Sequence, residues 1–239
     1  MKILLIVPAY NEQENILNVC KTIEQSNVEV DYVVINDGST DDTLKILKEN
    51  KLNHINLVHN LGIGGAVQTG YKYALENDYD IAIQFDGDGQ HDINYVQTIC
   101  EPIIDGQADF CIGSRYIDEH TSSFKSTRIR RLGKNIISAI INLFWKQKIT
   151  DPTSGFRAGN KEVIKIFANE YPIDYPEPES TVNLLKKGYK VTERPVNMNE
   201  RKAGKSFVNP WTSSLYMIKV SLAIIVDSIF RTGGKTKWI

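Results

Sequence analysis

Two aspartates, Asp86 and Asp88, stand on either side of a single glycine and directly follow the apolar run Ile81–Phe85. Carboxylates on alternate residues at the end of a buried strand can hold a divalent cation, because Mg²⁺ and Mn²⁺ commonly use one or two carboxylates together with substrate phosphates. Most Asp-Gly-Asp strings are solvated turns, so the motif alone does not decide between a turn and a metal site. A calcium-binding EF-hand is a poor fit, since His91 stands where that loop needs glycine and Gln97 where it needs glutamate.

Polar residues also follow the other apolar runs of the first half. Asp37 can accept hydrogen bonds from a nucleobase or a ribose, or it can belong to a helix-capping turn; Ser39 and Thr40 can cap the next helix without it. Tyr10 can pack against a base, although an aromatic residue after a strand is often part of the core. Ligands of parallel α/β sheets bind beyond the carboxyl ends of the strands. Four polar strings meet that condition: Pro8–Glu12, Asn36–Ser39, His59–Gly62 and Asp86–His91.

These strings are separated by apolar runs that alternate with helical patterns. Runs of this length, several of them rich in Val and Ile, are typical of strands buried on both faces of a parallel sheet. They are Ile3–Val7, Tyr32–Ile35, Ile55–Val58, Ile81–Phe85 and Phe110–Ile112. Between them, apolar residues recur at helical spacing, as at Ile16, Val19, Cys20 and Ile23. The sequence therefore predicts an α/β fold, with an open, mostly parallel sheet and helices on both faces.

After Ser114 this alternation stops. We expect the later elements to be a helix Asn135–Phe144, a loop Asp151–Gly155, a helix around Ser180–Lys187, a strand around Lys190–Val196 and a basic loop Arg201–Lys205. Lys219 and Asp227 interrupt the apolar stretch Leu215–Phe230. A helix that spans a membrane needs about 20 mostly apolar residues, so we expect this stretch to lie on a membrane surface or in a core.

Composition narrows the function. The chain has 239 residues with a formal net charge of −1, which argues against a nucleic-acid binder that works through bulk positive charge. Its three cysteines, Cys20, Cys100 and Cys111, form no C-x-x-C pair. They predict neither a zinc site nor a disulfide framework, and a reducing cytosolic compartment is expected.

Together the four strings resemble glycosyltransferase family 2, whose members have the GT-A fold. The matching segments are Val7–Glu12, Asn36–Asp41, Asn60–Gly62 and Asp86–His91, in the family's order. The resemblance implies an enzyme that uses a nucleoside-diphosphate sugar and Mg²⁺ or Mn²⁺. It assigns nucleotide binding to Pro8, Tyr10, Glu12, Asp37, Asn60, Gly62 and Asp86, and the metal to Asp86, Asp88 and Gln90.

The second half resembles a narrower branch, the dolichyl- and undecaprenyl-phosphate glycosyltransferases. The segments that carry this resemblance are Gly113–Tyr116, the basic run before Asn135, Asp151–Arg157, Glu193–Val196 and Arg201–Ser206. It implies a polyprenyl phosphate acceptor and catalytic roles for Asp86, Asp88, Arg115 and Arg201. The candidates to bind the acceptor phosphate are Arg128, Arg131, Arg157 and Lys205, each with a solvated surface position as its alternative.

The acceptor decides which groups the reaction needs. A phosphate monoester is already anionic near pH 7, because its second pKa is about 6, so transfer to it with inversion at C1 needs cations and no strong base. A sugar hydroxyl of a cell-surface polysaccharide or glycolipid would need a carboxylate base. Glu177 and Glu179 lie roughly where such transferases carry that base, and helix N-terminal charge is the alternative for Glu179.

The rival classes are a nucleotidyltransferase, which would need a glycine-rich basic loop after the first strand, and a non-catalytic membrane-associated binding subunit.

The expected organisation is one catalytic domain over residues 1–210, with a nucleotide-binding half at 1–114 and an acceptor-binding half at 115–210. A C-terminal helix and basic tail follow at 211–239. We expect a peripheral protein at the cytoplasmic face of the membrane, which it can reach by this tail or through a small membrane-protein partner.

Overall fold

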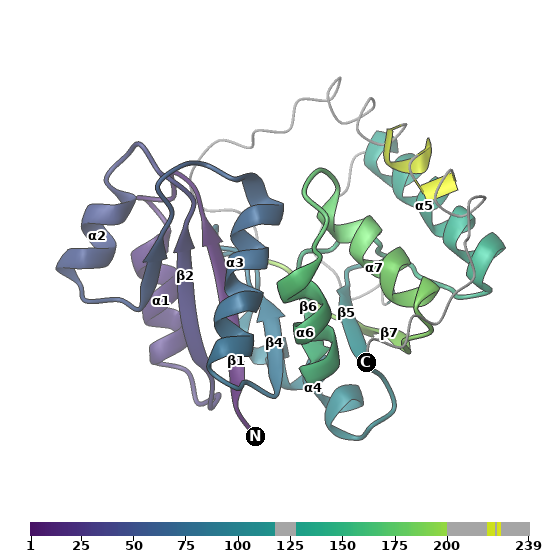
Figure 1. Ribbon diagram of the computed structural model, residues 1–239, viewed down its shortest axis with the longest axis horizontal. Helices are drawn as coiled ribbons and strands as arrows, with labels where there is room; N and C mark the ends of the chain where they lie inside the picture. The colour runs from purple at the N-terminus through teal and green to yellow at the C-terminus, as the bar shows by residue number, and fades with distance from the viewer. Residues whose placement is uncertain (118–127, 200–218, 223, 226–239) are drawn as a thin grey trace.

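The computed structural model of the chain describes residues 1–117, 128–199, 219–222, 224 and 225, and for residues 128–130 the backbone alone. Within these residues seven strands form one sheet in the order β3-β2-β1-β4-β6-β5-β7 (Figure 1). Every pairing is parallel except those of β6, which runs antiparallel to both β4 and β5. The strands are β1 (Ile3–Ala9), β2 (Asp31–Asn36), β3 (His54–Asn56), β4 (Ile81–Gln84), β5 (Phe110–Ser114), β6 (Arg157–Asn160) and β7 (Val191–Pro195).

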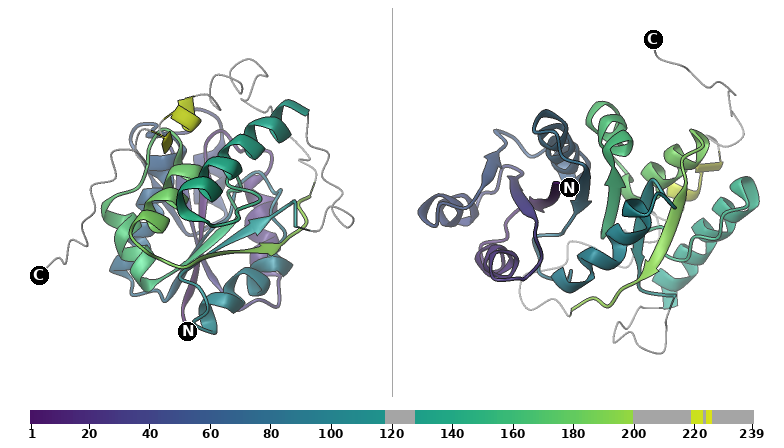
Figure 2. Two further views of the ribbon diagram at one scale, coloured as in Figure 1. Left: turned by 90° about the vertical axis from the view of Figure 1, so that its right-hand side faces the viewer. Right: turned by 90° about the horizontal axis from the view of Figure 1, so that it is seen from below.

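Helices cover both faces of the sheet (Figure 2). They are α1 (Ile16–Glu24), α2 (Thr43–Glu49), α3 (Gly62–Glu76), α4 (Val96–Ile104), α5 (Arg128–Trp145), α6 (Lys161–Asn169) and α7 (Pro176–Lys186), with a 3₁₀ turn at Ile93–Tyr95. One core cluster joins the sheet to α3, α5, α6 and α7, and a second joins it to α1, α2 and α4. Along β1, Leu4 and Ile6 belong to the first cluster while Leu5 and Val7 belong to the second. This alternation follows from the two-residue period of a strand and explains why β1 is a continuous apolar run.

The predicted open, mostly parallel α/β sheet is confirmed, and all five strands expected in the first half are present. The third was predicted too late in the sequence, since β3 ends at Asn56 and Val58 is 84% exposed. The prediction missed β6, a four-residue strand with the sequence Arg-Ala-Gly-Asn that lacks an apolar run. Because β6 lies between β4 and β5, the two predicted halves of the domain share one interleaved sheet.

The described part of the C-terminal apolar stretch packs on the core with one side. Val220 and Ile224 are buried in the same cluster as the inward residues of α5 and α7, while Lys219 and Leu222 are exposed. In both figures these residues lie beside α5 and α7. No helix in the described part of the chain is long and apolar enough to cross a membrane.

Candidate active site

The polar strings that follow β1 and β2 form one hydrogen-bonded unit. The main-chain N–H of Asn11 donates to Ser39 Oγ at 2.9 Å, and that of Thr40 donates to Asn11 Oδ1 at 2.8 Å. The N–H of Asp37 donates to the carbonyl of Ala9 at 2.9 Å. Ser39 is therefore engaged with the β1 string. The N-cap residue of α2, Asp42, makes no side-chain cap hydrogen bond, and the start of the helix is held by the preceding Asp41, whose Oδ1 accepts from the N–H of Thr43 at 2.9 Å.

Asp37 joins this unit to the N-terminus of α3. Its side chain is 3% exposed, and Oδ1 accepts a hydrogen bond from the N–H of Leu61 at 2.7 Å. Burial raises the pKa of Asp37, against the lowering effect of hydrogen bonds from the N–H groups of Leu61 and Gly62. Gly38 has a φ of +66°, and a Cβ there would lie 2.8 Å from the nitrogen of Asn60. The strings after β1, β2 and β3 thus meet at one edge, as the sequence predicted.

The fourth string follows β4 and lies against the first. A Cβ at Gly87 would lie 2.9 Å from the carbonyl oxygen of Pro8, so this close approach requires glycine. Asp86 and Asp88 are both half-buried. Oδ1 of Asp88 accepts a hydrogen bond from the N–H of Gln90 at 3.0 Å, and the carbonyl of Gln90 accepts one from the N–H of Asn199 at 2.8 Å. The loop that carries the two aspartates is therefore hydrogen-bonded to the chain that leaves β7.

His91 and Gln84 hold Asp86 from two sides. Gln84 Nε2 donates to Asp86 Oδ1 at 3.2 Å, and His91 Nε2 lies 3.5 Å from Asp86 Oδ2. His91 Nδ1 accepts from the N–H of Asp86 at 2.9 Å, which leaves the ring proton on Nε2, facing the carboxylate. Burial lowers the pKa of His91, which favours this neutral form over the opposing effect of Asp86 and Asp88. The ring stacks on Phe156, with centroids 4.7 Å apart.

The residues present fit a divalent cation shared with a substrate. In the described residues, no group of three or more His, Cys, Asp and Glu side chains could hold a metal ion by itself. Two carboxylates and an amide at Asp86, Asp88 and Gln90 would leave coordination positions for water and for diphosphate oxygens, which is how Mg²⁺ sites are commonly completed. His91 Nδ1 already accepts a hydrogen bond, so that atom is not available as a ligand.

Arg115, at the end of β5, is held by a buried carboxylate. Its Nε lies 2.6 Å from Asp151 Oδ2 and its Nη2 lies 2.8 Å from Asp151 Oδ1, while the Asp151 side chain is fully buried. Burial opposes the charge of Arg115, but the hydrogen bonds and charge of Asp151 raise its pKa above the usual value. The charge of Asp86 acts in the same direction, so the guanidinium lies within electrostatic range of the predicted metal loop.

A second carboxylate fixes the loop that carries Asp151. Glu193 on β7 accepts hydrogen bonds from the N–H of Thr150 at 2.7 Å and from the N–H of Asp151 at 2.8 Å. Burial raises the pKa of Glu193, while these donors lower it. A Cβ at Gly155, in the same loop, would lie 2.9 Å from Asp86 Oδ2. The sequence predicted no role for Asp151 or Gly155, because these contacts join segments about 40 to 70 positions apart, beyond the reach of sequence periodicity.

The prediction that Arg157 binds an acceptor phosphate is wrong. Its side chain is fully buried on β6. Its guanidinium donates to the carbonyl of Ser154 at 2.6 Å, to the carbonyl of Glu177 at 2.7 Å and to Ser180 Oγ at 2.8 Å. Arg157 therefore ties β6 to the Asp151–Gly155 loop and to the start of α7. The sequence could not distinguish this use of an arginine from an exposed one.

Of the two candidate bases, Glu177 has a pKa on which the charge of Asp86 acts. Burial raises the pKa of Glu177, Arg157 lowers it, and the charge of Asp86 raises it further. The Glu177 carboxylate also interacts with the side chain of Gln84, which donates to Asp86. This arrangement brings together Gln84, Asp86 and Glu177 from β4, the loop after it and α7.

The remaining predicted residues are the nucleotide-binding candidates on the strings after β1 and β3, the acceptor-phosphate candidate Arg131, and three residues that the structure does not describe in full. Tyr10 is 36% exposed and Asn60 is exposed, while Pro8 is buried and Glu12 accepts a hydrogen bond from Asn15 Nδ2 at 2.7 Å. Arg131 is exposed on α5. Arg201, Lys205 and the side chain of Arg128 lie outside the described residues.

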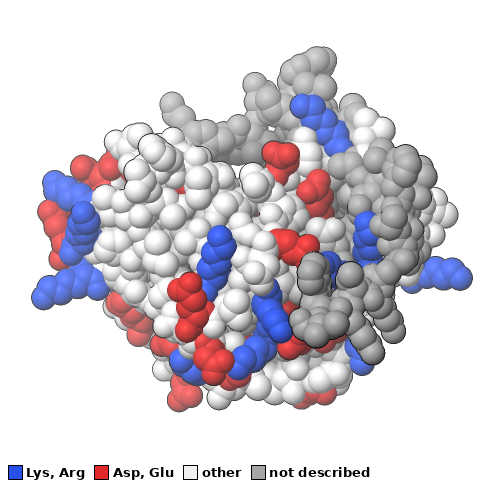
Figure 3. Space-filling view, viewed as in Figure 1, with Lys and Arg blue, Asp and Glu red and all other residues white. Residues whose placement is uncertain are grey.

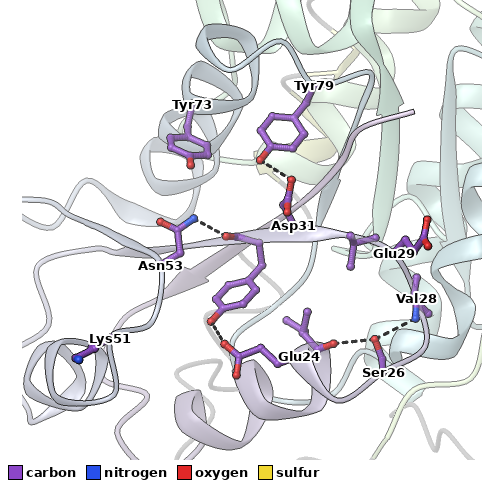
Figure 4. A pocket seen from close by; sticks show the side chains of 12 residues that line it. Glu24, Ser26, Val28, Glu29, Asp31, Lys51, Asn53, Tyr73 and Tyr79 are labelled. Carbon is purple, nitrogen blue, oxygen red and sulfur yellow. Dashed lines mark hydrogen bonds between the residues drawn. The ribbon is translucent and has the colours of Figure 1, made fainter.

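A separate depression of about 560 Å³ lies at the opposite end of β2 (Figure 4). Two pairs of its polar side chains are hydrogen-bonded to each other: Tyr32 Oη donates to Glu24 Oε1 at 2.5 Å and Tyr79 Oη donates to Asp31 Oδ2 at 3.0 Å. It contains none of the predicted site residues. On the described surface visible in Figure 3, acidic and basic side chains are interspersed, as expected from the near-zero net charge.

Comparison with known proteins decides the family. Residues 4–167 match the sequence profile of Glycosyl transferase family 2. The chain belongs to glycosyltransferase family 2. It is 34% identical over 186 residues to UDP-N-acetylglucosamine–dolichyl-phosphate N-acetylglucosaminyltransferase of Methanococcus voltae, covering 70% of this chain and 73% of the relative. It is 28% identical over 237 residues to polyprenol monophosphomannose synthase of Mycolicibacterium smegmatis, covering 91% and 85%.

The fold of this family 2 glycosyltransferase is GT-A. Glucosyl-3-phosphoglycerate synthase of Mycobacterium tuberculosis, crystallised with Mn²⁺, UDP and phosphoglyceric acid, superposes with a TM-score of 0.70 at 16% identity. The superposition covers 96% of this chain and 78% of that one. At this identity the likeness is one of fold.

Proposed function

We propose that this glycosyltransferase moves a sugar from a nucleoside diphosphate to a polyprenyl phosphate, with inversion at C1 and with Mg²⁺ or Mn²⁺ at Asp86, Asp88 and Gln90. The acceptor class is supported by the relatives named for dolichyl and polyprenol phosphates. The observation that carries the donor side is the meeting of Asp37, Asp86 and Asp88 at the carboxyl edge of the sheet, where ligands of such sheets bind.

In this proposal the nucleoside lies over the strings after β1 and β2. The exposed ring of Tyr10 offers an apolar face for the base. Asp37 Oδ1 accepts a hydrogen bond from Leu61, and a carboxylate has further acceptor positions for a hydrogen bond from the base or the ribose. Asp37 then both positions the start of α3 and contacts the donor.

The transfer breaks the bond between C1 and the diphosphate oxygen and forms a bond between C1 and the acceptor oxygen. A bound cation would neutralise the negative charge that develops on the departing diphosphate. Asp86 and Asp88 present the carboxylates for it, and His91 and Gln84 keep Asp86 in place. Arg115 supplies a fixed positive charge close to Asp86, and its bidentate pair with Asp151 sets its orientation. Arg201 is assigned to the same phosphates by resemblance.

The position of Glu177 favours a second candidate, transfer to a sugar hydroxyl. A carboxyl whose pKa is raised by burial and by the charge of Asp86 is a suitable general base for such an acceptor. A Glu177→Gln variant separates the two. It should abolish transfer to a hydroxyl acceptor, whereas a phosphate acceptor that is already anionic should lose far less.

The acceptor itself is tested with the purified full chain, a panel of UDP-, GDP- and dTDP-sugars, and Mg²⁺ or Mn²⁺. Undecaprenyl phosphate and a short water-soluble prenyl phosphate are compared with free sugars. We expect product with the prenyl phosphates and none in EDTA. Product with sugars alone would reject the lipid phosphate and keep the glycosyltransferase. We place the reaction at the cytoplasmic face of the membrane, where nucleotide sugars and a lipid acceptor can meet.

A further inference from the structure

The outward face of α5 is apolar, although it has no described neighbour in the fold. Leu132, Ile136 and Leu143 are 64%, 45% and 76% exposed. At 100° per residue they lie within about 40° of one another around the helix, so they form one stripe. The opposite face packs into the core through Ile137 and Ile141, both fully buried. A surface helix of a globular protein normally carries polar residues opposite its core face.

Charge around this stripe has one sign. Arg131 is exposed beside the first residue of the stripe, and Lys146 and Lys148 are exposed just beyond the last. Between Glu119 and Asp151 the sequence has no Asp or Glu, although the whole chain has a net charge of −1. The basic residues in that interval are Lys125, Arg128, Arg130, Arg131, Lys134, Lys146 and Lys148.

We propose that the outward stripe of α5 inserts into the interface of an anionic membrane, with the flanking basic residues on the lipid headgroups. An apolar helix face bordered by Lys and Arg is the pattern of helices that lie in a membrane interface. Three large apolar side chains are too few for a stable protein–protein interface, which takes about 20 to 30 residues from each partner. The inference rests on the proposed function, because it specifies how the enzyme meets a lipid acceptor.

The position of α5 links this docking to the active site. Lys134 Nζ on α5 lies 4.0 Å from the ring centroid of Tyr116, and Tyr116 follows Arg115 in the chain. Lys134 projects from the side of α5 opposite the stripe, so a membrane that receives the stripe would lie one helix diameter, about 10 Å, from Tyr116 and the neighbouring Arg115. This differs from the expectation that the Leu215–Phe230 stretch makes the contact, since Val220 and Ile224 of that stretch face the core.

The test is flotation of the full chain with vesicles of phosphatidylcholine alone or mixed with phosphatidylglycerol, without any polyprenyl phosphate. Wild type should bind the anionic vesicles, and binding should weaken as salt rises. Ile136→Glu and Leu143→Glu should each reduce the partition coefficient about tenfold or more, because each variant carries a charge where wild type would insert an apolar side chain into the membrane interface. The matched control is Ile104→Glu on α4, which is 51% exposed and should bind as wild type does.

Charge-reversal variants test the contribution of the basic residues to vesicle binding. Lys146→Glu and Lys148→Glu should each lower binding about fivefold or more, in line with the contribution of one basic residue near an anionic surface, whereas Lys72→Glu on α3 should not. Equal binding by wild type and the stripe variants, or equal loss in Ile104→Glu, would overturn the inference. So would a dimer in solution that Leu143→Glu dissociates, because the stripe would then be a protein interface.

The two proposals fail separately. All stripe variants should keep wild-type transfer to a short, water-soluble prenyl phosphate, which also shows that they are folded. Wild type that transfers to this acceptor but ignores anionic vesicles contradicts the docking surface alone. Binding to vesicles through α5 with no transfer to any prenyl phosphate contradicts the proposed acceptor.

Discussion

The two sides of the candidate active site are held together differently. On the donor side, the strings after β1 and β2 are joined by hydrogen bonds among backbone groups and small polar side chains, as between Asn11 and Ser39, and the Asp37 carboxylate joins them to the string after β3. On the other side, buried charges connect the segments, with Asp151 on Arg115 and Glu193 on the Asp151 loop. A hydrogen bond contributes about 0.5–1.5 kcal/mol between neutral groups and about 1.5–3 kcal/mol to a charged group such as the Asp37 carboxylate, whereas removal of one partner of a buried ion pair costs about 3–5 kcal/mol. The second side should therefore be more sensitive to single substitutions.

The largest expected loss of stability is at Asp151. An Asp151→Asn substitution leaves the buried guanidinium of Arg115 without its counter-charge and should lower the free energy of unfolding by about 3–5 kcal/mol. The matched control is Asp41→Asn on the donor side, which keeps a side-chain oxygen to accept from the Thr43 N–H and should cost less than about 0.5 kcal/mol. Urea unfolding of both variants gives the comparison. Similar losses at the two positions would show that the sides are not held differently.

Two substitutions of His91 test separately its contact with the backbone N–H of Asp86 and its contact with the Asp86 carboxylate. In His91→Asn the amide oxygen can still accept from the Asp86 N–H, whereas His91→Gln can still donate toward the carboxylate. If orientation of Asp86 matters for the cation, Mn²⁺-dependent affinity for a nucleoside diphosphate should fall about 10–100-fold in His91→Asn and less in His91→Gln. Affinity measured by calorimetry in EDTA should change little in either variant. Equal losses with and without metal would limit His91 to packing on Phe156.

A smaller effect is expected at Asp37, which belongs to the donor side. Asp37→Ala removes the hydrogen bond to Leu61 and the proposed contact with the nucleoside. Nucleotide affinity should fall by about 0.5–1.5 kcal/mol, with less effect on the chemical step at saturation. Calorimetry of nucleotide binding decides the point. Unchanged affinity with reduced stability would leave Asp37 as the group that positions α3, and no more.

The smallest expected effect is a pH dependence at Glu193. Its pKa is raised in the folded protein by burial, so the folded state holds this proton more tightly than the unfolded state. Stability from this group is therefore present below the ordinary carboxyl pKa and is lost as pH rises through the raised value. Glu193→Gln should flatten that part of the curve of unfolding free energy against pH, and Glu162→Gln, at an exposed position, should not. Parallel curves for wild type and Glu193→Gln would contradict the assignment.

The donor side was largely predictable from sequence because its contacts come from local strings at strand ends. Periodicity predicts parallel strands, and the tips of such strands must meet, so the sequence points to the strings Asn36–Ser39, His59–Gly62 and Asp86–His91, within which the family resemblance assigned Asn60 and Gly62. The aspartate pair is a weak signal alone and gains its meaning from the other three strings. The string Ser39–Asp42 offered several groups to cap the next helix, and local spacing did not show that Asp41 bonds the start of α2 while Ser39 is used by Asn11.

The other side was less predictable because its contacts join distant positions. Strand β6 is short, polar in sequence and antiparallel, and its Arg157 is buried by long-range acceptors that no local pattern indicates. For the same reason Arg157 was predicted to bind a phosphate, and no role was predicted for Asp151, Gly155 or Gln84. Glu193 belonged to a matching string, but its part in fixing Thr150 and Asp151 needs the pairing of β5 with β7.

The central claim is that Asp86 and Asp88 serve a metal-dependent transfer to a polyprenyl phosphate. It is tested most directly by transfer from a nucleotide sugar to a short water-soluble prenyl phosphate, in EDTA and then with Mn²⁺ restored, for wild type and Asp88→Ala. Asp88 is a half-buried strand-end residue outside the core clusters, so the variant should unfold as wild type does. We predict metal-restored product for wild type and background for Asp88→Ala. Full activity in EDTA, or an active Asp88→Ala, would contradict the account.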